Sequence, residues 1–277
     1  MVSFERSYRG GVKLKNYFFA YIDDIPKELH SALLTVQHLL SIGMILCLWI
    51  ILILIFKDKD DKVKWRFMAI TSLLLPILEV ALMIWYKSVG QFSFGYVLPL
   101  HLCSLMCIIM PVTVYTRNNL LMEYSYAMGI APSLMTLFTP DVYYYPTFSF
   151  IYMETMVVHG IICFIPIFFI FCLGFRPNIR NLPKTIAILF GLAVMIIPVN
   201  HITDGNYFFL RYPATGSIME YFSNIVGSPG YLIPVFLVGC ILWLLMYLPF
   251  VLIEQRQKCK KPIYLTQKSI KRSKFSI

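Results

Sequence analysis

Few cysteine, histidine and glutamate side chains occur in this sequence, and most of them stand inside long apolar runs, where a titratable group is costly. The segment PLHLCS places His101 two residues before Cys103. A cysteine thiol becomes a nucleophile when a base or a cation favours its thiolate form. Residues two apart do not face each other on a regular helix. A base for Cys103 would therefore come from another helix, with His159 as the first candidate and His201 as the second.

The same residues allow a purely structural interpretation. Free cysteine is among the most buried residue types, so Cys103 could be a small apolar packing residue. His159 precedes Gly160, which allows close helix approach, and its ring could serve only as an interhelical hydrogen-bonding group. Pro99 lacks a backbone donor and is expected to bend the helix that carries His101 and Cys103.

A second group of polar residues could support such a site. Two carboxylates inside apolar runs could orient or neutralise a histidine. Another apolar run ends in an Asp-Gly turn with flanking amides, which could bind a lipid headgroup or simply form an ordinary helix exit. These supporting candidates are His101, Glu79, Glu154, Asn200, His201, Asp204, Asn206 and Tyr207.

The sequence predicts neither a metal nor a cofactor. A zinc site needs three or four nitrogen, sulfur or carboxylate ligands, and His-x-Cys is not a zinc signature. No phosphate-binding glycine loop, dinucleotide fingerprint or G-x-S-x-G elbow occurs. The seven cysteines are odd in number and irregularly spaced, so no disulfide framework is predicted.

Apolar runs are the elements that must position these side chains. The chain has 277 residues, of which 58% are hydrophobic and 14% charged, whereas a soluble domain carries about 25% charged residues. A membrane span needs about 20 apolar residues and must be helical. The sequence therefore predicts an all-α membrane protein, a bundle of seven transmembrane helices at residues 31–56, 67–86, 96–116, 120–139, 150–175, 183–200 and 231–253, with an outer loop at 202–230 that re-enters the membrane or caps a site. The fourth run holds polar residues and is expected to be buried among the other helices.

The candidate residues are predicted to gather in one half of the bilayer. At about 1.5 Å per helical residue, most of them fall within three turns of the same membrane face. Only Glu123 is expected near the opposite face. The outer group comprises His38, Glu79, His101, Cys103, Glu154, His159 and His201. This convergence is the strongest sequence-based indication of a site.

Charge distribution predicts the orientation. Seven Lys and Arg residues fall on the N-terminal side of the spans and 17 on the other, which together are the 24 of the chain. Positive loops stay in the cytoplasm. The N-terminal arm (1–30) is therefore predicted outside the cell and the basic tail (254–277) in the cytoplasm, in a multi-pass protein of the cell membrane. The net charge of +10 could suggest nucleic acid, but the Lys and Arg residues lie at the chain ends and in short loops between apolar runs, which is typical of a membrane protein. Membrane phospholipids are therefore the predicted partners, with anionic headgroups at the tail and no nucleic acid.

The segment PLHLCS, the His159–Gly160 pair and the segment GNYFFL at 205–210, followed by PATGS at 213–217, resemble the YwaF-like integral membrane family of Firmicutes and mollicutes. That family is similar to the eukaryotic transmembrane protein 164 family, and the resemblance covers roughly residues 30 to 250. Where a further basic residue is expected after Arg211, this chain has Tyr212.

The resemblance implies a function. The eukaryotic family comprises phospholipid acyltransferases in which a cysteine and a histidine are taken as catalytic. Carried onto this sequence, it implies a seven-helix fold, Cys103 as the nucleophile that accepts an acyl chain as a thioester, and His159 as its base.

Two other classes of function stay open from the residues. In a seven-helix transporter or ligand-binding protein the same polar cluster would hold a ligand or couple protons, and the thiol would be dispensable. In a structural or partner-binding subunit no single polar residue of the cluster would matter.

Overall fold

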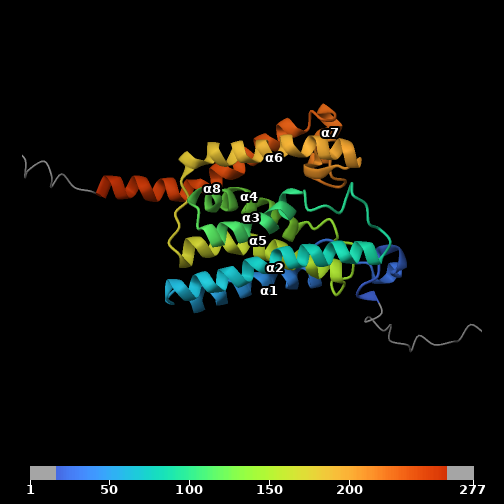
Figure 1. The fold of residues 1–277 in the computed structure, drawn as a ribbon, viewed down its shortest axis with the longest axis horizontal. Coiled ribbons are helices and arrows are strands. Elements are labelled where there is room, and N and C mark those ends of the chain that lie inside the picture. Colours follow the sequence, from blue (N-terminus) through green and yellow to red (C-terminus); the bar gives the residue numbers. More distant parts are fainter. Residues whose placement is uncertain (1–16, 261–277) are drawn as a thin grey trace, which may run out of the picture.

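The computed structural model describes residues 17–260, and within that range all regular secondary structure is helical. The first four α-helices are α1 (Val36–Phe56), α2 (Asp61–Ser88), α3 (Leu102–Thr116) and α4 (Asn119–Phe138). They are followed by α5 (Phe150–Cys172), α6 (Leu182–Thr203), α7 (Ile218–Val226) and α8 (Leu232–Lys260). Apart from the short α7, these helices run along the long axis of the molecule (Figure 1).

Five of the described helices are long and apolar enough to cross a membrane: α1, α2, α5, α6 and α8. Helix α3 has 15 residues, about 22 Å of helix, and is therefore short for a span. Many large apolar side chains of the five helices are exposed, as lipid-facing surfaces require. The chain is thus a multi-pass helical membrane protein.

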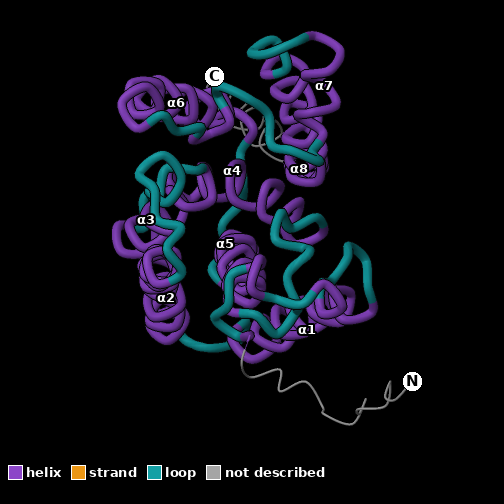
Figure 2. The backbone as a smooth tube through the Cα atoms, turned by 90° about the vertical axis from the view of Figure 1, so that its right-hand side faces the viewer, coloured by secondary structure: helices purple, strands orange, loops and turns teal. Residues whose placement is uncertain are grey.

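Helix α5 forms the centre of the bundle. It packs against α1, α2, α3 and α4, and the end-on view places it between α2 and α1 (Figure 2). Its C-terminal half carries large apolar side chains such as Phe164, Phe168 and Phe169, all of which are buried. The site residues on α5 are therefore held by the best-packed helix of the molecule.

Helix α4 is buried, as predicted from its polar residues. Ten of its 20 residues are buried, among them Glu123 and Gly129. On the side away from α5 it packs against α6 and contacts α8, where the Trp243 indole N–H donates to the Ala127 carbonyl at 2.9 Å. Because α4 is covered on both sides, its polar groups do not face lipid.

The predicted run at 96–116 is helical only from Leu102 onward, which corrects the expectation of a helix bent at Pro99. Pro99 precedes the helix, and His101 is the N-cap residue with φ −70° and ψ 157°. Proline removes a helical donor and favours an extended conformation in the residue before it. The chain therefore enters α3 through a non-helical segment of turns and bends at 93–101.

Parts of the two predicted terminal segments fall outside the described range. Residues 1–16 of the arm and 261–277 of the basic tail are not described, and α8 continues to Lys260. The rest of the arm is tied to the bundle, because the Phe18 carbonyl accepts from the Phe150 amide at 2.7 Å and the Phe19 carbonyl accepts from the Trp85 indole at 2.9 Å. The predicted outer loop contains α7, a two-turn amphipathic helix that the sequence analysis did not anticipate.

Candidate functional site

Cys103 lies in the first turn of α3 and is half-buried. The first N–H groups of an α-helix have no acceptor within the helix. At this helix the N-cap side chain of His101 does not accept from them, and the first backbone bond runs from Leu105 to the His101 carbonyl at 2.8 Å. The thiol therefore sits beside backbone donors that could bind a developing negative charge.

Polar groups from three other elements lie within electrostatic range of this thiol. Ser133 on α4 is fully buried and lies near Cys103, and its hydroxyl has no hydrogen-bond partner in the described part of the chain. The charges of Glu79 on α2 and Asp141 in the α4–α5 loop also act on Cys103. The cysteine is thus placed in a polar setting and not in a purely apolar one.

Glu79 and Glu154 form a pair of buried carboxylates between α2 and α5. Their exposed fractions are 8% and 6%, and each lies within electrostatic range of the other. Glu79 also faces Ser104 and Cys107 of α3. Within residues 17–260, neither carboxylate forms an ion pair with Lys, Arg or His. Unpaired carboxylates at such depth are typical of functional sites in membrane proteins.

One ring nitrogen of His159 is held by the preceding turn of its own helix. Its Nδ1 lies 2.8 Å from the Thr155 carbonyl oxygen of the preceding turn. A carbonyl can only accept, so Nδ1 carries the proton and Nε2 keeps a free lone pair. Asp141 acts on His159 as it does on Cys103. No hydrogen bond joins His159 to Cys103 among the described residues.

A pocket of about 330 Å³ opens near Asp141 at the same end of the bundle. Ile151, which lines it, lies one turn before Glu154 on α5. Burial, reinforced by the charge of Asp141, raises the pKa of Tyr144 to about 12, so this hydroxyl remains a hydrogen-bond donor at neutral pH. The pocket wall is mostly aromatic and polar: Tyr21, Tyr86, Gln91, Ser93, Tyr96, Asp141, Val142, Tyr144, Tyr145 and Ile151.

Asn200 and Tyr207 fasten the end of α6 to the segment that leads into α3. The Asn200 side chain accepts from the Tyr207 amide at 2.7 Å and donates to its carbonyl at 3.0 Å. The Tyr207 hydroxyl donates to the Phe94 carbonyl at 2.6 Å and accepts from the Leu98 amide at 2.9 Å. The ring of Tyr207 lies 5.2 Å from that of His101. The polar atoms of both residues are therefore used to position this segment.

The remaining candidates of the α6 exit lie nearer the surface. Asp204, in a left-handed conformation (φ 53°), pairs with Arg211 at 2.7 Å. The Asn206 side chain accepts from the amides of Arg211 and Tyr212 and donates to the Tyr212 carbonyl at 2.7 Å. His201 is exposed. These residues shape the turn, and the structure brings none of them into contact with Cys103.

Two neighbours of the candidate site were missed by sequence reasoning. Ser133 is an ordinary serine in a helical run, and its buried position follows only from the packing of α4. Asp141 stands alone in a tyrosine-rich loop, which is a weak signal for its proximity to Cys103, His159 and Glu154. Across the described residues, no group of three or more His, Cys, Asp or Glu side chains is arranged to hold a metal ion.

Comparison with protein families yields a match over most of the chain. The family model described as the TMEM164 family matches residues 33–247, which include helices α1 to α7 and the first half of α8. No curated protein and no solved structure matches the chain.

Proposed function

We propose that this chain, which belongs to the TMEM164 family, is a membrane-embedded lipid acyltransferase. In this reaction Cys103 carries the acyl chain as a thioester. The observation that supports this most directly is the position of Cys103, in the uncapped first turn of α3 and among polar groups of α2, α4 and the α4–α5 loop. The tyrosine-lined pocket at the same end of the bundle offers a place for a polar headgroup.

The proposal includes seven spans in a cell membrane, formed by α1 to α6 and α8, with the N-terminus outside. The Lys and Arg residues favour this orientation, because 17 of the 24 fall on the side that would face the cytoplasm. The Cys103 thiol, the two buried carboxylates and the pocket then lie on the side of the outer leaflet. Membrane phospholipids are the substrates, and the basic tail, much of which lies outside the described residues, contacts anionic headgroups.

In the first half-reaction, the Cys103 thiol gives its proton to a base and attacks an ester carbonyl of a phospholipid. The C–S bond forms, the ester C–O bond breaks, and the lysolipid leaves as an alcohol after receiving the proton. The first-turn amides of α3 stabilise the oxyanion of the tetrahedral intermediate. His159 is the base, through the free lone pair of Nε2, either by side-chain movement or through a water molecule.

In the second half-reaction, the hydroxyl of an acceptor lysolipid attacks the thioester. The new ester C–O bond forms, the C–S bond breaks, and the acceptor proton returns to the thiolate through the same base. Glu79, which faces Ser104 and Cys107, and Glu154 border the site from α2 and α5. His101 and the Asn200–Tyr207 link support the entry to α3.

The test is intact-mass measurement on the full chain in lipid, for wild type beside Cys103→Ala. Cys240→Ala is the matched control, because Cys240 is also half-buried but lies on α8. We expect an added acyl mass, removed by hydroxylamine, on wild type and on Cys240→Ala, and none on Cys103→Ala. Loss of the adduct in both variants, or persistence of the adduct in Cys103→Ala, would contradict the assignment of Cys103.

A second candidate function is proton-coupled transport or ligand binding. It is favoured by Glu79 and Glu154, two neighbouring buried carboxylates that form no ion pair with a basic residue among the described residues. Transport would survive Cys103→Ala and fail in Glu79→Gln or Glu154→Gln. Measuring acyl transfer and substrate uptake on the same three variants separates the two functions.

A further inference from the structure

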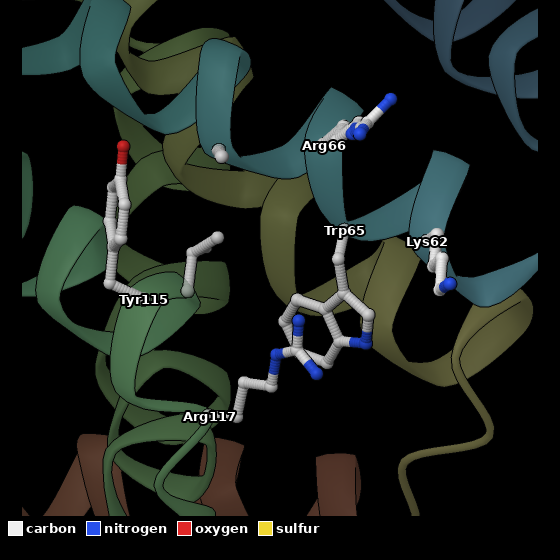
Figure 3. Close-up of a pocket in the computed structure, with 7 residues that line it drawn as sticks. Lys62, Trp65, Arg66, Tyr115 and Arg117 are labelled. Atoms are coloured by element: carbon white, nitrogen blue, oxygen red, sulfur yellow. The ribbon is translucent and has the colours of Figure 1, made fainter.

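The opposite end of the bundle carries a second pocket, of about 280 Å³, between the start of α2 and the end of α3. It is lined by Lys62, Trp65 and Arg66 of α2 and by Arg117 just after α3, among others. Figure 3 shows the Arg117 guanidinium against the Trp65 indole, and the guanidinium carbon lies 4.6 Å from the ring centroid. We call this site the basic pocket. Cations over a tryptophan face are held by the ring electrostatics.

The charge of the basic pocket is not compensated by its own lining. Three of its seven lining residues are basic, and none is acidic. Asp61, the acidic residue closest in sequence, pairs instead with the buried Lys64 at 3.3 Å. Lys62 and Arg66 are one helical turn apart and both exposed. The pocket is therefore open to an anionic ligand.

Arg117 is held at a conformational cost. Its φ of 52° and ψ of 29° place it in the left-handed region, where the C-cap of a helix usually has glycine. For a residue with a Cβ this conformation costs about 1 kcal/mol. An arginine at this position places its guanidinium against Trp65. A residue that only ended the helix would not need this side chain, so the contact with Trp65 explains why the conformational cost is accepted.

The surface next to the basic pocket is apolar on both helices. Along α2 the residue one turn beyond Arg66 is Ile70, which is 66% exposed. On α3, Ile108 and Val112 lie on the face of Tyr115, at helical spacings of seven and three residues, and all three are exposed. A cationic end followed by exposed apolar residues fits a lipid, with its headgroup in the pocket and its chains along the helices.

We propose that the basic pocket binds the phosphate headgroup of an anionic phospholipid in the leaflet that faces the Lys- and Arg-rich loops. Arginine matches the geometry of phosphate oxygens, and basic pockets between membrane helices are suited to such headgroups. A volume of about 280 Å³ is small for a whole ligand site, which fits a headgroup whose chains stay outside. The proposal does not depend on acyl transfer by this chain.

The experiment is native mass spectrometry of the full chain in detergent, titrated with phosphatidylglycerol, phosphatidylcholine or inorganic phosphate. The variant is Arg66→Gln with Arg117→Gln. Its control is Lys59→Gln with Arg180→Gln, which removes two exposed positive charges from the same side outside the pocket. We expect the phosphatidylglycerol affinity to fall about 10- to 30-fold in the pocket variant and less than about twofold in the control.

Three outcomes would overturn the proposal. Equal losses in the two variants would show non-specific attraction of charge to the whole face. Phosphatidylcholine binding as tight as phosphatidylglycerol binding would remove the role of net negative charge. Displacement of the lipid by millimolar inorganic phosphate, with no dependence on the acyl chains, would assign the pocket to a free anion. If the double variant does not fold, Lys62→Gln alone is measured, with an expected loss of about fivefold.

Discussion

Replacing Asn200 by leucine tests how the end of α6 positions the entry to α3. Asn200 is 1% exposed and Tyr207 is fully buried. Leucine is similar in size to asparagine, so the change removes both hydrogen bonds without opening a large cavity. The Tyr207 amide and carbonyl are then left buried without partners, which costs about 1–3 kcal/mol each. We expect the free energy of unfolding to fall by about 2–4 kcal/mol, toward the lower value if lipid-side relaxation lets these groups find other partners.

The assay has a global and a local part. Reversible unfolding in mixed micelles gives the free energy, and hydrogen exchange gives the protection of the Tyr207 amide, which donates to Asn200 at 2.7 Å. A local loss of about 3 kcal/mol speeds exchange of this amide by about 100-fold. Asn224→Leu, at an exposed position of α7, is the control and should change the free energy by less than about 0.5 kcal/mol.

The Asn200→Leu substitution should also affect the segment next to the candidate site. Once Tyr207 is released, its hydroxyl no longer holds the Phe94 carbonyl and the Leu98 amide. The segment that carries His101 should then exchange faster as well, whereas the core of α5 should not. If Asn200→Leu unfolds like wild type and protection at Tyr207 is unchanged, the reasoning that these two residues fasten the segment is refuted.

Two further predictions follow from close contacts elsewhere. Gly95→Ala should lower the thermal midpoint in detergent, because a Cβ at this position would lie 2.8 Å from the Thr203 carbonyl oxygen, whereas Gly43→Ala, where a Cβ meets nothing within 4 Å, should not; equal midpoints would contradict this. Glu123→Leu should lower the free energy of unfolding by about 2–4 kcal/mol, because the carboxylate accepts from the Asn178 amide at 2.7 Å and from the Tyr247 hydroxyl at 2.9 Å. Glu123→Gln should retain most of that stability. An equally large loss in Glu123→Gln would show that the site requires the charge and not the hydrogen bonds.

The helical fold was predictable from sequence because lipid leaves the backbone little choice. An apolar run of about 20 residues must satisfy its own donors and acceptors, so helices could be placed from composition alone. The main difference is at the start of α3, where the chain stays non-helical through Pro99 and the helix begins only after His101. Helix α7 was missed because nine residues within a polar loop give too short a pattern to distinguish from a turn.

The residues that gather at the candidate site were predictable from sequence, but the contacts between them were not. Depth along each helix indicated that Glu79, Cys103 and Glu154 would share one end, and the structure places them within electrostatic range of one another or of a common neighbour. Rotation of a helix about its axis depends on the packing of distant residues, which one sequence does not reveal. This is why Ser133 was overlooked and why the sequence could not decide whether Asn200 and Tyr207 bind a headgroup or form an ordinary helix exit.

The two pockets are too far apart for one lipid. Glu79 and Lys62 are 17 residues apart on α2, which is about 25 Å along the helix. A bilayer core is about 30 Å thick, so each leaflet supplies about 15 Å of chain. A lipid at the basic pocket and a lipid at Cys103 would therefore come from opposite leaflets. The Arg66→Gln, Arg117→Gln variant should then leave the KM for acyl transfer unchanged while it weakens anionic-lipid binding. A rise in KM that follows the lost affinity would instead show that α2 couples the two ends.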